Sequence, residues 1–237
     1  MTWSIIARDI ATARIGIAVS TKFFAVGSRV PHINAGVGAI ASQALMNPFY
    51  GPKGLELLCV GRTATEVVGQ LTDADDGRAH RQLHVMDRQG QFAAYTGSSC
   101  IDWCGHQIHD GFSVAGNMLA GPQVIEATAQ TYRELAKVPF ARRLIAAMNA
   151  GEAAGGDKRG KQSAALLIHD AQDYSLLDLR VDDHGDPLGE LARLEAVARE
   201  RWVHFRRFMP SNEYPAGLTD RVDLDARIAQ SIAEGYE

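Results

Sequence analysis

This sequence of 237 residues contains few cysteines and has a small net charge. The formal net charge is only −4, so the chain has no strong positive field to attract nucleic acid or anionic lipid. No run approaches the roughly 18 apolar residues that span a bilayer, and residues 1–8 lack the basic and apolar segments of a signal peptide. We therefore expect neither nucleic acid nor a membrane as a partner.

The cysteines are Cys59, Cys100 and Cys104. Three cysteines in a chain of this length do not make a disulfide framework, and an odd number leaves at least one free thiol. A reducing compartment fits this usage best. The sequence therefore predicts a cytoplasmic protein.

Hydrophobic residues make up 46% of the chain and charged residues 22%, which is ordinary for a globular domain with a sizeable core. No linker or repeat interrupts the sequence, and we expect one domain over residues 1–209 and an acidic tail or short helix over residues 210–237. Strand pairs alternate with helix pairs, which predicts an α+β protein in which helices cover antiparallel sheets. The expected strands are Thr2–Ala7, Ile15–Ser20, Phe23–Val30, Gly36–Ala41, Leu83–Asp87, Phe92–Thr96, Phe112–Gly116, Ser163–His169 and Ser175–Val181.

Helices are predicted where apolar residues recur every three or four positions. Thr63 and Glu66 have the spacing of a capping box, and Gly151 is the expected end of the helix that begins at Pro139. The expected helices are Gly54–Val60, Thr63–Leu71, Pro122 to about Ala136, Pro139 to about Ala150, and Leu188–Phe208.

Thr2 directly precedes a strand and is the first candidate catalytic residue. Initiator methionine is commonly removed before small residues, and its removal would make Thr2 the N-terminal residue. A terminal threonine supplies its hydroxyl as nucleophile and its α-amine, with an ordinary pKa of about 7.7–8.0, as base. Threonine is also common at position 2 of proteins that lack this activity, and a retained Met1 would disable the mechanism. Ser4 is a second candidate nucleophile, for which the sequence indicates no base.

A glycine-rich charged loop, residues 154–163, lies between a predicted helix and a strand. Its glycines let backbone amides approach a ligand, and its cations suit a carboxylate. The spacing is not that of a P-loop, and an exposed turn needs no function. The candidate catalytic residues here are Asp157 and Lys158, and the candidate substrate-binding residues are Gly155, Gly156 and Arg159.

Asn117 follows a predicted strand in the segment Gly116–Gly121. Its side-chain amide can donate to a developing oxyanion, as can backbone amides nearby. The alternative is an asparagine that caps the local turn. We take Asn117 as a candidate catalytic residue.

Two further patterns bear on cofactors. Residues Gly36 to Ala41 match G-x-G-x-x-A, but no βαβ unit surrounds them, so dinucleotide binding is not expected. Cys100, Cys104, His106 and His109 include the residue types that bind zinc, at a spacing that no standard zinc motif has. We expect neither a metal nor another cofactor.

Several stretches together resemble a mainly bacterial family, domain of unknown function 1028, which is placed in the N-terminal-nucleophile hydrolase superfamily. The resemblance implies a four-layer αββα sandwich and leaves the substrate open. The glycine-rich loop is its most specific element, although Cys104 stands where relatives often carry a small residue. The other matching segments are residues 2–9, 16–20, 25–28, 35–39, 47–51, 81–82, 96–97, 116–119 and 179–184.

Taken with Thr2, this resemblance implies a hydrolase of a small amide or related acyl bond, acting on a small-molecule substrate. Asn117 and backbone amides would stabilise the oxyanion. Asp157 and Lys158 would orient the α-amine or bind a substrate carboxylate. The rival interpretation is a non-catalytic ligand-binding or assembly protein on the same scaffold, with Met1 retained.

The predicted helix Leu188–Phe208 ends in large apolar residues, which are favoured at interface centres, and two-fold pairing is the commonest assembly. We therefore expect a homodimer at micromolar concentration, measured by light scattering. Phe208→Glu should give folded monomers, because a charge buried without a partner is costly. A monomeric wild type, or a dimer that Phe208→Glu leaves intact, would contradict this expectation. The alternative is that the helix covers a sheet of its own subunit.

Overall fold

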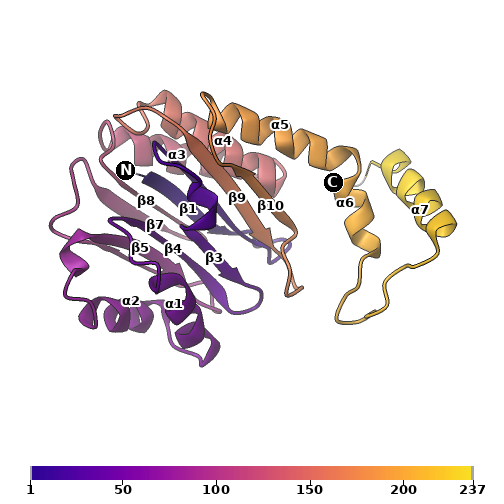
Figure 1. The fold of residues 1–237 in the computed structure, drawn as a ribbon, viewed down its shortest axis with the longest axis horizontal. Helices are drawn as coiled ribbons and strands as arrows, with labels where there is room; N and C mark the ends of the chain where they lie inside the picture. Colours follow the sequence, from indigo (N-terminus) through magenta and orange to yellow (C-terminus); the bar gives the residue numbers. More distant parts are fainter. Residues whose placement is uncertain (1, 236–237) are drawn as a thin grey trace. The chain divides into compact units, whose positions relative to one another are not determined.

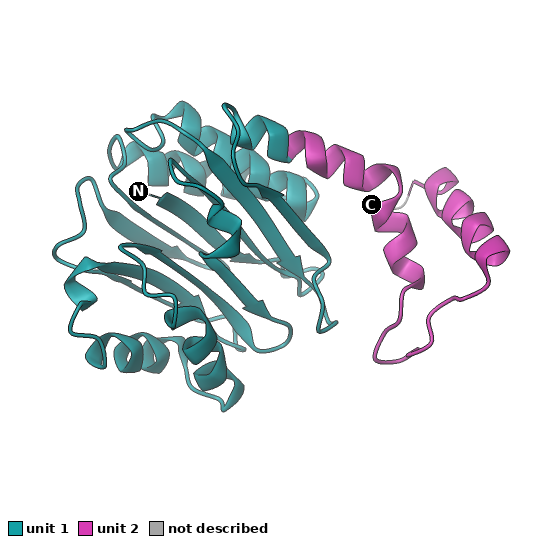
Figure 2. Ribbon diagram, viewed as in Figure 1, with its two compact units in different colours: residues 1–191 teal, residues 192–237 magenta. Residues whose placement is uncertain are grey.

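The computed structural model describes residues 2–235. The chain divides into two compact units, residues 1–191 and 192–237 (Figure 2). The first unit contains both sheets and the helices that cover them (Figure 1). Over the described residues, no helix combines the length and the apolar character that a membrane span requires.

The larger sheet has six strands in the order β10-β9-β2-β1-β8-β7, and every neighbouring pair is antiparallel. Strand β1 lies inside this sheet, so both of its edges are hydrogen-bonded. The six strands are β1 (Thr2–Arg8), β2 (Ile15–Thr21), β7 (Gly105–His109), β8 (Phe112–Asn117), β9 (Ser163–His169) and β10 (Leu177–Val181).

The smaller sheet has four antiparallel strands in the order β3-β4-β5-β6. Its strands follow the period of two that a pleated strand dictates. In β4, for example, Ala39 and Ala41 belong to the core between the sheets, whereas Ile40 belongs to the core under the helices. The strands are β3 (Pro31–Asn34), β4 (Gly38–Ala44), β5 (Arg81–Met86) and β6 (Phe92–Thr96).

Helices cover the outer face of each sheet (Figure 1). Helices α1 (Tyr50–Cys59) and α2 (Ala64–Asp73) contact the smaller sheet, and α3 (Gln123–Glu134) and α4 (Phe140–Ala153) contact the larger one. The result is the expected αββα order of layers. The prediction of an α+β sandwich is confirmed. The capping box is also confirmed, since Glu66 N donates to Thr63 Oγ1 at 3.3 Å and Thr63 N donates to the Glu66 carboxylate at 2.8 Å.

The expected strand Phe23–Val30 is wrong. Ala25 has a left-handed backbone (φ 54°), and a short 3-10 helix, Val26–Ser28, follows it. The hydroxyl of Ser163 accepts from Val26 N at 3.1 Å and donates to the Phe23 carbonyl at 2.6 Å, so a side chain supplies the hydrogen bonds that a neighbouring strand would otherwise make.

Several other boundaries also differ from the expectation. Strands β3 and β7 were not expected, and the helix expected over Leu188–Phe208 is broken at Arg201, whose backbone (φ −146°, ψ −40°) is not helical. Gly151 does not end its helix, because α4 continues to Ala153. The second unit contains the end of α5 (Pro187–Glu200), α6 (Trp202–Phe205), a 3-10 turn (Arg206–Phe208) and α7 (Arg221–Ala233).

Gly151 lies where α4 crosses β1 and α3. A Cβ at this position would overlap Thr128 Oγ1 and lie 2.9 Å from Trp3 Nε1, and both side chains are fully buried. The glycine is therefore required by the close approach of the helices and the sheet, and not by a helix end.

We predict that Gly151→Ala lowers the free energy of unfolding by about 1–3 kcal/mol, the usual cost of overpacking a core. Gly69→Ala in α2 is the matched control, because its Cβ would meet nothing within 4 Å. This control should be more stable than the wild type by about 0.5–1 kcal/mol, since alanine favours a helix. Urea unfolding measures both changes, and a Gly151→Ala protein as stable as the wild type would refute this account of α4.

Candidate functional site

Thr2 begins β1, and its side chain lies on the face of the larger sheet that is turned toward the smaller one. Ser4 and Ile6 share this face, while Trp3 packs against α4 on the other side. The Thr2 hydroxyl donates to the Thr21 hydroxyl at 3.1 Å, and Thr2 is 7% exposed. Thr2 is paired with Asn117 of β8, and Trp3, the next residue, is paired on both sides, with Ser20 of β2 and Gly116 of β8.

Thr2 lines a cavity of about 300 Å³ between the Phe23–Val30 segment and the end of β4. A second cavity of about 290 Å³ lies on the other side of the same strand end and is lined by Asn117 and Met118. Ala44 and Leu45 line both. The strand ends that carry Thr2 and Asn117 therefore each face a small cavity, at the lower limit of the usual size of ligand pockets.

Three residues around these cavities have a left-handed backbone although none is glycine. They are Ala25 (φ 54°), Ala44 (φ 70°) and Met118 (φ 53°). Such residues are uncommon, cost about 1–3 kcal/mol each and gather at functional sites. Of the four in the described chain, only Ala13, in the β1–β2 turn, lies elsewhere.

Buried side-chain amides connect the two sheets behind Thr2. Gln43 Nε2 donates to the Gln82 Oε1 (2.9 Å), to the Ala115 carbonyl (3.1 Å) and to the Thr2 carbonyl (3.4 Å). Gln82 Nε2 donates to the carbonyl of Gly116 at 2.8 Å and to that of Gly105 at 3.1 Å. Because these amides bond to the carbonyls of Thr2, Gly105, Ala115 and Gly116, the network fixes the register of the sheets around Thr2.

Asn117 is brought directly beside Thr2, since the two residues are paired across β1 and β8. Its Nδ2 donates to the Gln82 Oε1 at 2.9 Å and to the Thr2 carbonyl at 3.4 Å. The side chain is almost fully buried. Asn117 is therefore an ordered amide donor within hydrogen-bonding distance of the Thr2 backbone.

The glycine-rich loop approaches Thr2 indirectly, through Asp157. The buried Asp157 carboxylate accepts from Lys22 N at 2.8 Å, and Lys22 follows Thr21, the partner of the Thr2 hydroxyl. Arg159 forms an ion pair with Asp157 at 3.2 Å. Asp157 thus holds the end of β2 in place.

The other loop residues lie farther from Thr2. Lys158 Nζ donates to the Asp102 carbonyl at 2.7 Å and is not brought to Thr2. Gly155 (φ 118°) and Gly156 (φ 47°) form the turn, and the Gly156 carbonyl accepts from Ala120 N at 3.0 Å. None of the described residues that line the two cavities comes from this loop.

Ser4 lies next to a histidine that the sequence did not indicate. Its Oγ is 2.9 Å from His84 Nε2 and donates to Gln43 Oε1 at 2.7 Å, while His84 Nδ1 is 2.6 Å from the Ser113 hydroxyl. Because the Ser4 proton is directed at Gln43, His84 is not placed to accept it. Ser4, His84 and Ser113 are all fully buried and line neither cavity. The cluster is a satisfied polar core.

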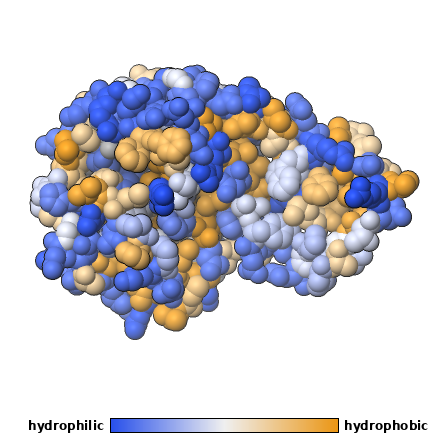
Figure 3. Space-filling view, viewed as in Figure 1, coloured by the Kyte–Doolittle hydropathy of each residue, from blue (hydrophilic) through white to orange (hydrophobic). Residues whose placement is uncertain are grey.

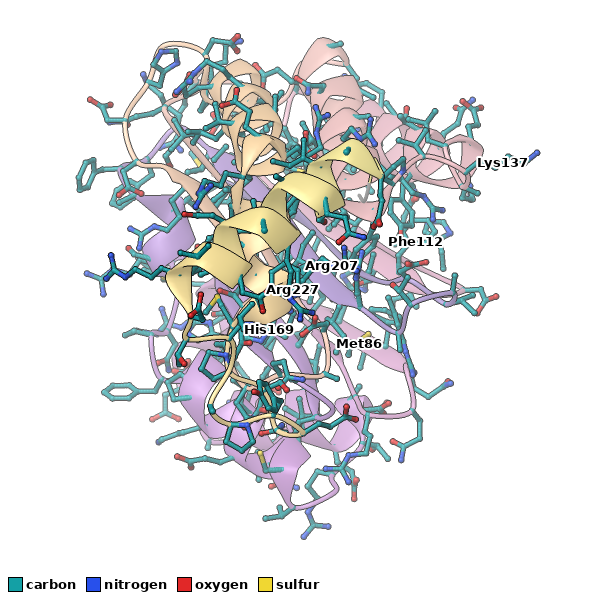
Figure 4. All side chains as sticks on the ribbon, turned by 90° about the vertical axis from the view of Figure 1, so that its right-hand side faces the viewer. Met86, Phe112, Lys137, His169, Arg207 and Arg227 are labelled. Carbon is teal, nitrogen blue, oxygen red and sulfur yellow. The ribbon has the colours of Figure 1, made fainter. Side chains whose placement is uncertain are left out.

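The cysteines and histidines considered for zinc have other partners. Cys104 Sγ donates to the Cys100 carbonyl at 3.5 Å, and His106 Nδ1 is 2.9 Å from the Thr96 hydroxyl. The His109 ring stacks on that of Phe112, with 4.6 Å between the ring centroids. Phe112 is labelled in Figure 4. Burial raises the pKa of the Cys100 thiol, and burial first and the nearby Asp102 second raise that of Cys104 to about 11, so both thiols are protonated at neutral pH. Across residues 2–235, no three His, Cys, Asp or Glu side chains gather as a metal site would require.

Sequence reasoning missed Thr21, Gln43, Gln82 and His84. A signal for three of them exists in hindsight, because Gln43, Gln82 and His84 are polar residues within strands that are otherwise apolar and buried. In β5, Gln82, His84 and Met86 share the face toward the other sheet, while Leu83 and Val85 face the helices.

The fold and the site define an αββα protein with a threonine at the end of its central strand. The chain belongs to a family of unknown function, DUF1028, whose model matches residues 2–191. The crystal structure of protein SPO2555 from Silicibacter pomeroyi, of the same family, has a TM-score of 0.85 and 33% identity, over 93% of this chain and 96% of that one. The match supports the fold and the family.

A more distant solved structure is Anbu, an ancestral β-subunit from Yersinia bercovieri. It has a TM-score of 0.40 and 12% identity, over 83% of this chain and 94% of that one. At this level the likeness carries no functional argument. No curated protein matches the chain.

Burial lowers the pKa of His84 to about 3, with a smaller contribution from His106. The folded state therefore keeps His84 neutral, whereas the unfolded chain takes up a proton below its ordinary pKa of 6.5. The contribution of His84 to the free energy of unfolding is therefore fully present above pH 6.5 and is lost as the pH falls toward 3.

We predict that between pH 7 and pH 5 the wild type loses about 2 kcal/mol more unfolding free energy than His84→Gln. Glutamine retains hydrogen bonding to Ser4 and Ser113 but does not titrate. Urea unfolding at the two pH values measures the difference. Equal losses in the two proteins would mean that His84 does not titrate on unfolding in this range.

Proposed function

We propose that this protein is an N-terminal-nucleophile hydrolase of a small amide or related acyl bond, with Thr2 as nucleophile once Met1 is removed. The observation that carries the proposal is the position of Thr2. Thr2 is the first residue of the central strand β1 and lines a cavity. The Thr21 hydroxyl and the buried side-chain amides of Gln43 and Asn117 lie within hydrogen-bonding distance of it. Nucleophile, base and oxyanion donors would then lie within one hydrogen-bonded unit.

In the proposed reaction, Thr2 Oγ attacks the carbonyl carbon of an amide R–CO–NH–R′, and its proton passes to the α-amine. The α-amine then protonates the leaving nitrogen, which departs as R′–NH₂, and the acyl group stays on Thr2 as an ester. Water attacks this ester, releases R–COOH and restores the hydroxyl. Each step uses atoms of Thr2, the substrate and water.

We assign stabilisation of the oxyanion to Asn117, whose Nδ2 lies 3.4 Å from the Thr2 carbonyl, although its side chain lines the second cavity. Its bond to the Thr2 carbonyl, at 3.4 Å, is the longer of its two, so an oxyanion can replace that acceptor while Gln82 continues to orient the amide. Removing one such donor from a hydrolase typically costs 10²–10³ in kcat. Asp157 is a positioning residue in this proposal, because it acts through Lys22 and Thr21.

The rival function is a non-catalytic ligand-binding or assembly protein that retains Met1. The buried amide network favours neither alternative, because it also stabilises the fold. A cytoplasmic homodimer is proposed for both. Intact mass separates the two functions, since the enzyme must lack one methionine.

We predict that the wild type lacks Met1 and releases a burst of about one p-nitrophenolate per chain from p-nitrophenyl acetate, as an acyl-enzyme forms. Thr2→Ala should remove the burst and keep the melting temperature. Thr2→Ser should keep the burst, because serine retains both the hydroxyl and the α-amine.

Two control variants make the test specific. Thr12→Ala changes an exposed threonine in the β1–β2 turn and should leave the burst intact. Ser4→Ala should also retain it. A burst that survives in Thr2→Ala, or one that disappears in Ser4→Ala while the protein stays folded, would exclude Thr2 as the nucleophile.

A further inference from the structure

The cavity that Thr2 lines is mostly apolar. Thr2, Thr21 and Gln43 contribute polar groups from the strand ends, and Arg29 is the only charged residue among the described lining. Apolar side chains make up most of the remaining wall. They are Phe23, Phe24, Val26, Val30, Leu45 and Met46.

Both aromatic side chains of this wall are exposed to solvent. Phe23 is 64% and Phe24 61% exposed, although both line the cavity. On the face that Figure 3 draws, apolar residues are interspersed with hydrophilic ones. Adjacent exposed phenylalanines beside a cavity provide apolar surface for a ligand that covers them.

Arg29 is the cation that lines this cavity, whereas Lys22, next to Thr21, directs its Nζ to the Lys161 carbonyl at 3.3 Å. Arg159 pairs with Asp157 and Arg180 with Asp182, whereas no acidic side chain among residues 2–235 pairs with Arg29. A guanidinium with free donors is suited to a carboxylate, which it can bind through two parallel hydrogen bonds. The cavity thus offers apolar walls and one unpaired positive charge.

We propose that this cavity binds an N-acylated apolar amino acid, with the apolar side chain against the phenylalanines and the free carboxylate on Arg29. The amide of such a molecule is the bond that Thr2 would cleave. Cleavage of this ligand therefore rests on the proposed function, whereas binding of the ligand does not. Among the described residues that line the cavity, none is acidic and could pair with an ammonium. An N-acylated amino acid therefore fits better than a peptide with a free amino group.

The test measures binding to full-length Thr2→Ala protein by calorimetry, so that turnover cannot interfere. N-acetyl-phenylalanine should bind about fivefold or more tightly than its neutral C-terminal amide, as expected for a partly exposed ion pair. Arg29→Gln in this background should abolish the difference. Arg14→Gln should preserve it, because Arg14 precedes β2 and the cavity lies at the other end of that strand.

A second pair of variants tests the apolar wall. Phe24→Ala should weaken binding of both ligands by a similar factor, because it removes apolar contact and no charge. Phe49→Ala is the matched control, since Phe49 is equally exposed at 63% but lines a different cleft, and it should bind as the parent does. Equal loss in both variants would overturn the assignment of Phe24 to the site.

Three outcomes would overturn the inference: equal affinity for the acid and its amide, no binding of either at millimolar concentration, or binding of glycyl-phenylalanine as tight as that of N-acetyl-phenylalanine. These failures are distinct from failure of the proposed function. The burst with p-nitrophenyl acetate reports acylation of Thr2 without requiring Arg29. Binding without a burst would keep the ligand site and exclude the hydrolase, and a burst without binding would do the reverse.

Discussion

Hydrogen bonding of two buried glutamines, Gln43 and Gln82, is the interaction on which the site depends. Each projects from the smaller sheet toward backbone carbonyls of the larger one, and a buried amide left without partners is costly. A shift of either strand by one residue would turn its glutamine to the helix side and leave those carbonyls unpaired. The network therefore holds the end of β1 at one position relative to β4 and β5.

Thr2 and Asn117 acquire their environment from this constraint. Their backbones are paired, and the Gln82 amide oxygen accepts from Asn117 and from Gln43. Beyond these residues, the chain leaves the sheets through the left-handed residues Ala44 and Met118, so that cavities form where strands would otherwise continue. A rigid polar core next to irregular strand ends is the arrangement that presents a reactive group without disturbing the fold.

The sequence was sufficient for the layers but not for the whole site. Alternating apolar residues and the capping pair Thr63–Glu66 act locally, so most strands and the start of α2 could be predicted. Residues 23–30 have strand-forming composition, yet Ser163, 137 residues away from Val26, replaces the strand partner, and no local pattern encodes that contact. Arg29 could not be identified for a related reason, because its lack of an acidic partner depends on distant segments.

The central claim is that Thr2 is a nucleophile at a cavity formed where β1, β2 and β4 end. Peptide mapping by mass spectrometry after brief incubation with p-nitrophenyl acetate and acid quenching tests it most directly, because it locates the acyl group. The account predicts one acetyl group, bound as a hydroxylamine-labile ester to Thr2 of an N-terminal peptide that lacks Met1. Acetylation of another residue only, or an N-terminal peptide that still carries Met1, would contradict it.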